Sequence, residues 1–192
     1  MRRALILALC LGLAACKEET RQDTSPVELV PETLGHFCQM NLLEHPGPKA
    51  QVHLEGLPGT PLFFSQVRDA IAYQRLPEQS HKILAIQVND MGAPAATWEV
   101  PGEGNWIPAG DAFYVVGSVA EGGMGLPETV PFGTRDAAEA FAAAQGGTVL
   151  RLSEIPDDLV LAPAEDPAAL PDSDDDADYE SRLRALSRPS EG

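Results

Sequence analysis

Two stretches of the chain repeat the same alternation of apolar and polar positions. Residues 64–73 read FSQVRDAIAY and residues 132–141 read FGTRDAAEAF. Both place apolar side chains three and four positions apart, a spacing that predicts an amphipathic helix. Ser65 and Thr134 stand near the two starts, and hydroxyl side chains are preferred N-cap acceptors. We therefore expect two helices, each entered through a hydroxyl cap.

Short apolar runs flank both helices and predict β-strands. They are residues 50–54, 60–63 and 82–88 in the first half, and residues 112–117, 129–132 and 148–152 in the second. The order of elements is ββαβ in both halves, and a segment rich in Gly and Pro joins them from residue 91 to residue 108. We predict an α+β fold of two small repeated ββαβ units, over residues 27–100 and 101–155, that arose by duplication.

The first sixteen residues have the pattern of a secretory signal. Arg2 and Arg3 precede an apolar run that ends in Leu-Ala-Ala-Cys, with its cysteine at position 16. The run is about a dozen residues long, too short to span a bilayer. Its ending resembles the bacterial lipobox, which implies cleavage before Cys16 and acylation of that residue; an ordinary secretory signal is the alternative. We predict a signal peptide over residues 1–15 and a lipidated, disordered polar tether over residues 16–26.

The charge of the chain is strongly negative and unevenly placed. The net charge is -16, and residues 156–192 hold eleven acidic and three basic residues, which is half of it. Such a stretch cannot bury enough apolar surface to offset its ordering entropy, so we predict a disordered acidic tail. Aspartate-rich runs can hold hard cations weakly, but a solvating role is the simpler interpretation. The charge also argues against nucleic acid as a partner.

One thiol remains in the mature chain. Cys10 would be removed with the signal peptide and Cys16 would be acylated, so Cys38 is left unpaired. An odd thiol in an oxidising compartment suggests a reactive group, an intermolecular bridge or a ligand. Met40 follows two positions later, and in an extended segment both side chains would share one face about 7 Å apart.

A thiolate and a thioether are soft donors that favour Cu(I). Structural zinc normally needs four sulfur or imidazole ligands at paired spacings, which this chain lacks. A core cysteine beside a core methionine is the alternative interpretation of the pair.

Further donors must come from elsewhere in the sequence. Met124 lies in a glycine-rich loop that predicts no strand or helix to bury it, and Met91 has a similar setting. Either could also fold back onto the core. His36 lies two positions before Cys38, and a neutral imidazole suits copper. For the other histidines, at positions 45, 53 and 81, a surface role is the simpler expectation.

These features together resemble the NosL family, the nitrous-oxide reductase accessory lipoproteins. The resemblance rests on the lipobox, the Cys-x-Met after Gly-His-Phe, the strand at residues 114–118, the Gly-Met-Gly loop and the Pro-Phe at residues 131–132. It covers residues 27–155 and none of the tail. It implies two ββαβ units, related in architecture to organomercurial lyase, and copper ligands at Cys38, Met40 and Met124. Where the family pattern has Gly-Pro-Met-Gly, this chain has Gly-Gly-Met-Gly.

The resemblance also implies a function. We expect a Cu(I) carrier, lipid-anchored in the bacterial cell envelope at the outer membrane and facing the periplasm. Its cargo would supply the copper-sulfide centre of nitrous-oxide reductase, together with a membrane ABC-type maturation complex. The expected mechanism is ligand exchange and not catalysis. Two rival classes remain: an enzyme that uses Cys38 as a nucleophile, and an envelope-tethered binding module in which both sulfurs are core.

Overall fold

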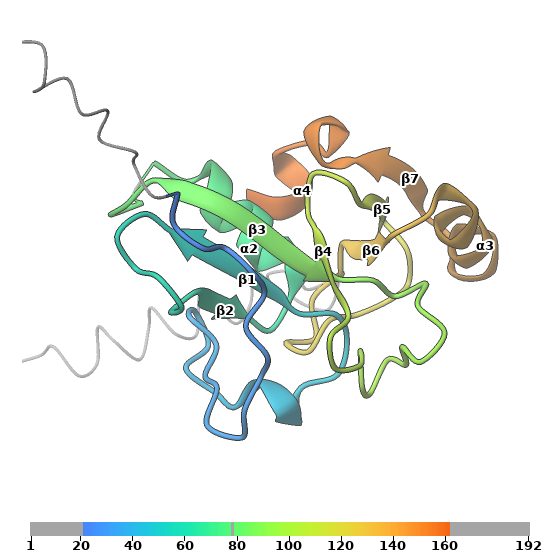
Figure 1. Cartoon of the computed structure of the whole chain (residues 1–192). Helices are drawn as coiled ribbons and strands as arrows, with labels where there is room; N and C mark the ends of the chain where they lie inside the picture. The colour runs from blue at the N-terminus through green and yellow to red at the C-terminus, as the bar shows by residue number, and fades with distance from the viewer. Residues whose placement is uncertain (1–20, 78, 162–192) are drawn as a thin grey trace, which may run out of the picture.

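A computed structural model describes residues 21–77 and 79–161 (Figure 1). The predicted signal peptide, Cys16 and the tail beyond residue 161 lie outside the described residues. Within the described part, no helix has both the length and the apolar character needed to cross a membrane.

In the described residues, seven strands form two antiparallel sheets. The first sheet has the order β2-β1-β3-β4, and its strands are β1 (Ala50–Leu54), β2 (Leu62–Phe64), β3 (Ile83–Asn89) and β4 (Trp106–Pro108). The second has the order β6-β5-β7, with β5 (Phe113–Val116), β6 (Val130–Phe132) and β7 (Thr148–Arg151). Helix α2 (Val67–Arg75) crosses from β2 to β3, and α3 (Arg135–Gln145) crosses from β6 to β7. The predicted α+β fold with ββαβ in each half is confirmed.

The two units are fused through a common core. In β1 the apolar positions alternate, so Ala50, Val52 and Leu54 share one face and pack in the first core with α2. The same cluster takes in Tyr114 and Val116 from the second sheet. A smaller cluster lies between the second sheet and α3. Neither unit therefore buries its apolar surface alone.

Strand β4 was not predicted. It lies at the end of the segment that we expected to be a Gly/Pro-rich connection, within the range assigned to the second unit. In the structure it pairs with β3 of the first sheet, with Trp106 opposite Asn89 and Pro108 opposite Gln87. The sequence of such a strand hardly predicts it, because it has only three residues and contains Pro. It forms at the edge of a sheet that other strands have built, where Pro is tolerated.

The two helices begin differently. Thr134 caps α3 as predicted, since its hydroxyl oxygen accepts from the backbone N–H of Ala137 at 3.3 Å. The predicted Ser65 cap of α2 is wrong. Gln66 is the N-cap residue there and makes no side-chain cap bond. The carboxylate of Glu128 takes that role from the second unit, some sixty residues away.

The end of the predicted tether lies against the first sheet. Gln22 accepts from the N–H of Gly56 and donates to the carbonyl of Leu54, both at 2.8 Å. The backbone of Val27 exchanges two hydrogen bonds with the Gln51 side chain. In Figure 1 this blue segment runs over the face of the sheet that α2 does not cover. Residues 22–27 are thus held against the first sheet by hydrogen bonds, which the tether prediction did not anticipate.

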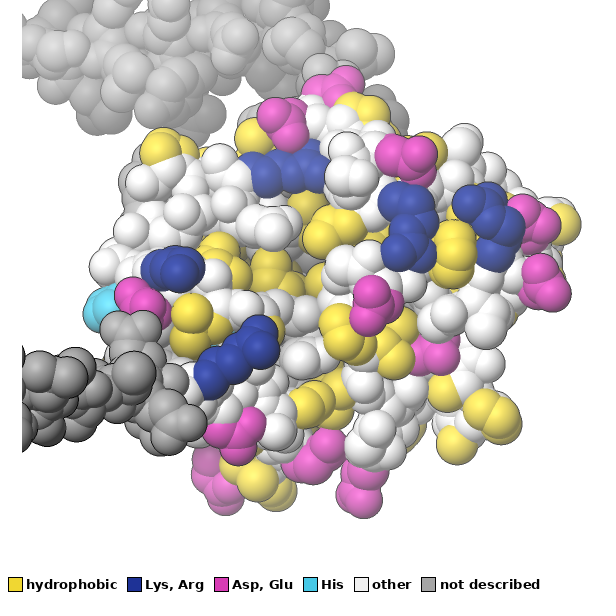
Figure 2. Space-filling model, turned by 45° about the horizontal axis from the view of Figure 1, so that its top comes forward, with side chains coloured by type: hydrophobic (Ala, Val, Ile, Leu, Met, Phe, Trp, Pro, Cys, Tyr) yellow, Lys and Arg dark blue, Asp and Glu magenta, His cyan; other side chains and the backbone are white. Residues whose placement is uncertain are grey.

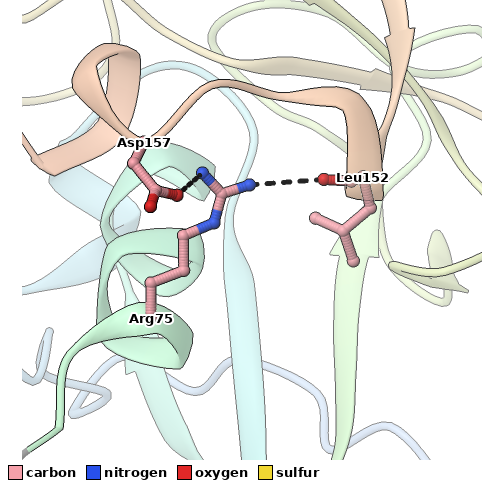
Figure 3. A network of polar contacts seen from close by, with 3 residues as sticks. All are labelled: Arg75, Leu152 and Asp157. Carbon is pink, nitrogen blue, oxygen red and sulfur yellow. Dashed lines mark hydrogen bonds and ion pairs between the residues drawn. The ribbon is translucent and has the colours of Figure 1, made fainter.

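The start of the predicted tail is also packed. Residues 156–161 include helix α4 (Asp158–Leu161), and Val160 is buried in the first core. The guanidinium of Arg75 bonds the Asp157 carboxylate at 2.7 Å and the carbonyl of Leu152 at 3.3 Å (Figure 3). The prediction of disorder from acidic composition is therefore wrong for residues 156–161. Composition did not indicate this, because one buried valine is enough to hold a single helical turn against the core.

Candidate metal site

Cys38 and Met40 lie in a tight turn and not in an extended segment. The backbone N–H of Gly35 donates to the carbonyl of Met40, and the N–H of Gln39 donates to the carbonyl of Gly35, each at 2.9 Å. Gln39 has a φ of 56°, in the left-handed region that non-glycine residues rarely adopt. The extended geometry that we expected is therefore wrong, because these backbone bonds close the chain into a turn.

The turn presents its sulfur atoms at the surface. Cys38 is unpaired and half-buried, and its Sγ lies directly over Gly35, where a Cβ atom would come within 2.4 Å of it. The side chain of Met40 is 40% exposed. Neither residue belongs to a core cluster. The interpretation of this pair as core packing is therefore contradicted.

The turn is fixed to the first unit at both ends. The N–H of His36 donates to the carbonyl of Phe63 at 2.6 Å, next to the end of β2. After the turn, Asn41 caps the short helix η2 (Leu42–Glu44), and Leu42 is fully buried. The positions of the sulfur donors are thus set by a hydrogen-bonded turn between two anchored residues.

His36 has an exposed ring that joins an aromatic group. Its ring centroid lies 5.6 Å from that of Phe64 and 5.5 Å from that of Tyr73, both in edge-on arrangements. Phe37 packs against Phe64 in the same way at 5.2 Å. Edge-to-face arrangements are favoured between aromatic rings, and His36 remains exposed in this group. His36 therefore combines a packed ring with access to solvent.

Met124 lies at the tip of a small hairpin in the second unit. The N–H of Glu128 donates to the carbonyl of Ala120 at the base, and the N–H of Gly125 donates to the carbonyl of Gly122 around the tip. The side chain of Met124 is 38% exposed. Gly125 has a φ of 72°, which a glycine adopts without strain and which closes this turn. The prediction that Met124 is displayed on a loop is confirmed.

This hairpin rests on the chain that follows the sulfur turn. His45 Nδ1 lies 2.9 Å from the carbonyl oxygen of Gly123. A Cβ atom at Gly123 would come within 2.6 Å of the Cβ of His45 and 2.9 Å of the carbonyl oxygen of Pro46. In Figure 1 the yellow loop before β6 passes beside the segment that leads into β1. The fold thus places the Met124 hairpin against residues 45–46, a few positions beyond Met40.

The other predicted candidates lie elsewhere. Met91 packs against the core of the second unit, and its N–H donates to the carbonyl of Pro131. His81 is exposed beside Ser80. His53, expected at the surface, is only 1% exposed, because the segment over residues 21–28 covers its face of the sheet. Burial lowers the pKa of His53.

Two buried charged groups beside the site had no sequence signal. Lys49 is 1% exposed, and its ammonium donates to the carbonyls of Pro46 and Gly47. Burial lowers the pKa of Lys49 to about 8, and the charges of Glu128 and Cys38 act in the opposite direction. Glu128 is 2% exposed, and burial raises its pKa to about 8 although three backbone N–H groups favour the carboxylate.

No group of three or more His, Cys, Asp or Glu side chains in the described part of the chain could hold an ion. On the face shown in Figure 2, Lys and Arg side chains lie among apolar and acidic ones. A hollow between the two units includes Arg75, Arg151 and Asp157, and none of the predicted ligands. Soft sulfur donors therefore remain the chemically distinctive feature of the molecule.

Comparisons with known proteins agree on one family. The sequence profile of the family described as NosL matches residues 26–160. The copper-binding lipoprotein NosL of Achromobacter cycloclastes is 60% identical over 195 residues, which cover 100% of this chain and 98% of that protein. The copper-binding lipoprotein NosL of Stutzerimonas stutzeri is 34% identical over 79% of this chain and 77% of that protein.

A solved structure shows the same fold. The crystal structure of the copper chaperone NosL from Shewanella denitrificans matches with a TM-score of 0.64 and 29% sequence identity. The match covers 69% of this chain and 96% of that chain.

Proposed function

Because this chain belongs to the NosL family, we propose that it binds Cu(I) as cargo through Cys38, Met40 and Met124 and transfers it to an acceptor. The observation that carries the proposal is the exposure of soft donors in both units, with the Met124 hairpin packed against residues 45–46, which follow the sulfur turn. Met40 and Met124 keep 40% and 38% of their surface free, so both residues are open to solvent.

The chemistry of these donors suits a monovalent copper ion. A thiolate and two thioethers are polarizable donors, and together they carry one negative charge. This combination favours Cu(I) over cations that prefer oxygen ligands. His36 is the fourth candidate donor, since its exposed ring lies in the same turn as Cys38. A site with few ligands at the surface protects the ion and still admits a thiol, thioether or imidazole from an acceptor. Transfer then proceeds through shared coordination, without a catalytic step.

The proposal extends to the place and the recipient. We propose that Cys16 carries the lipid anchor, and that the folded part faces the periplasm from the outer membrane. The copper would serve the assembly of the copper-sulfide centre of nitrous-oxide reductase, together with its ABC-type maturation complex. The family membership supports this role. A thiol-dependent enzyme is the competing class.

An anaerobic Cu(I) titration against a chromophoric competitor tests the proposal. The wild-type protein should bind one equivalent, and Cys38→Ser should abolish competitive binding. Met40→Leu and Met124→Leu should each weaken Cu(I) binding by about 100-fold, because each replaces a thioether ligand with an apolar side chain of similar size that cannot bind copper. The matched control is Met91→Leu, which replaces a methionine packed in the second core.

Spectroscopy distinguishes the ligand sets. X-ray absorption on the loaded protein should count three sulfur neighbours of copper. If a nitrogen neighbour is also seen, and if it is lost in His36→Gln, the imidazole of His36 is a ligand as well. Wild-type protein that fails to compete for Cu(I) would exclude the carrier function. Turnover of a thiol-dependent substrate without copper would favour the enzyme instead.

A further inference from the structure

A buried carboxylate joins the two units directly beneath the Met124 hairpin. Glu128 ends this hairpin, and its side chain points into the first unit. Its Oε1 accepts from the N–H of Arg68 at 3.1 Å and of Thr129 at 2.7 Å, and its Oε2 accepts from the N–H of Val67 at 3.3 Å. These donors include the N–H groups of the first two residues of α2, a position where no carbonyl of the helix itself accepts and where a helix favours negative charge.

The backbone of the hairpin also lies close to the side chain of Glu128 and to the side chain of Gln66. A Cβ atom at Gly122 would come within 2.7 Å of Glu128 Oε2 and within 2.4 Å of Gln66 Nε2. Gln66 also donates to the carbonyl of Leu126 at 3.3 Å, on the other strand of the hairpin. The hairpin therefore lies directly on the N-terminus of α2, with no room for a side chain between them.

The opposite side of the hairpin is held by the chain after the sulfur turn. Gly123 meets His45 and Pro46, as described above, and a Cβ atom at Gly47 would lie 3.7 Å from the Cα of Gly122. The tip that carries Met124 is thus enclosed between two parts of the first unit. Its position relative to Cys38 depends on contacts that belong to neither sulfur residue.

We propose that Glu128 is a positioning residue for copper binding, which holds the Met124 hairpin against the first unit at the distance that the shared site requires. This inference rests on the proposed function, and specifically on Met124 as a ligand. Glu128 touches no metal itself. It acts because its side chain binds the backbone of α2 while its backbone closes the hairpin base.

A double-mutant cycle on Cu(I) affinity tests the proposal. Glu128→Ala should lower the affinity by about 10- to 100-fold, the usual cost of removing a group that orients a ligand. In the Glu128→Ala background, Met124→Leu should then cost less than about threefold, because the thioether no longer reaches the ion. X-ray absorption on Glu128→Ala should count one sulfur neighbour fewer. Glu128→Gln keeps an acceptor oxygen and should recover most of the affinity.

A matched control comes from another carboxylate that links the units. Asp90 Oδ1 accepts from the N–H groups of Gly92 and Gly133, both at 2.8 Å, near the start of α3. Asp90→Ala also removes a carboxylate that binds backbone donors, but it touches no part of the Met124 hairpin. Its Cu(I) affinity and sulfur count should be those of the wild type.

A second perturbation keeps the test decisive if Glu128→Ala does not fold. Gly122→Ala introduces a methyl group into this contact, so the hairpin and the side chains of Gln66 and Glu128 must move apart. It should show the same loss and the same coupling to Met124→Leu. Gly110→Ala, where a Cβ atom meets nothing within 4 Å, is its control.

The outcomes separate this inference from the proposed function. If Met124→Leu weakens binding in the wild-type background and Glu128→Ala and Gly122→Ala do not, the positioning role is overturned and the copper function stands. Losses from Glu128→Ala and Met124→Leu that simply multiply would show a general structural effect and would also overturn it. If Met124→Leu leaves the wild-type affinity unchanged, the ligand assignment fails and the positioning role fails with it.

Discussion

Replacement of Gly35 by alanine should displace the thiol of Cys38, the proposed copper ligand, while the fold stays intact. The new Cβ atom would lie 2.4 Å from Cys38 Sγ and 3.4 Å from Leu42 Cδ2. Non-bonded carbon and sulfur atoms approach to about 3.7 Å, so the sulfur must retreat by more than 1 Å. The backbone itself is not strained by alanine, because Gly35 is not among the described glycines with positive φ.

The size of the effect follows from the freedom of the cysteine side chain. Rotation of χ1 to the next staggered position moves the sulfur by about 3 Å at little cost to the fold. Gly→Ala also reduces the entropy of the unfolded chain, so the free energy of unfolding should change by less than about 1 kcal/mol. A ligand displaced this far no longer faces the ion. We expect Cu(I) affinity to fall by about 10- to 100-fold.

Two measurements check this prediction. An anaerobic competitor titration gives the Cu(I) affinity, and the reaction rate of Cys38 with a thiol reagent reports that the sulfur has moved. Gly110→Ala is the control, since its Cβ atom meets nothing within 4 Å. A changed reaction rate with wild-type copper affinity would refute the reasoning, because the position of the sulfur over Gly35 would then have no part in binding.

Other predictions concern stability and specificity. Between pH 4.5 and about 8 the folded state holds the proton of Glu128 more tightly than the unfolded chain does, so the free energy of unfolding should fall as pH rises. Between about pH 8 and 10.5 Lys49 is protonated in the unfolded chain but not in the folded state, so the free energy of unfolding should rise again with pH. Each slope should be at most about 1.4 kcal/mol per pH unit. Urea unfolding across this range should show a minimum near pH 8, with the first limb lost in Glu128→Gln and the second in Lys49→Met. A curve without the falling limb would contradict the raised pKa of Glu128, and a curve without the rising limb would contradict the lowered pKa of Lys49. Thr134→Ala should lower the urea-derived stability by about 1 kcal/mol and leave Cu(I) affinity unchanged, and no loss of stability would mean that its 3.3 Å cap bond contributes nothing. Met91→Leu should keep wild-type copper affinity in the competitor titration, whereas a loss as large as that of Met124→Leu would place Met91 at the site.

Local patterns in the sequence determined the secondary structure and some of the ends. The helical spacing predicted α2 and α3, and the apolar runs predicted the strands on either side of them. The hydroxyl of Thr134 predicted the start of α3, because an N-cap contact spans only three residues. The glycine-rich loop predicted an exposed Met124 for a related reason, since glycines set the local backbone conformation.

The tertiary structure alone decided the contacts between distant segments. Glu128 caps α2 from a separation of 60 residues, and no local pattern distinguishes such a carboxylate from one in solvent. The burial of His53 depends on where residues 21–28 lie, and β4 depends on a sheet edge that other strands create. The sulfur turn departs from extended geometry because Gly35, Gln39 and Met40 bond one another through the backbone. Side-chain periodicity specifies which face a helix or strand buries. Which elements pack against one another depends on the free energy of packing the whole chain, and a short segment of sequence does not determine that free energy.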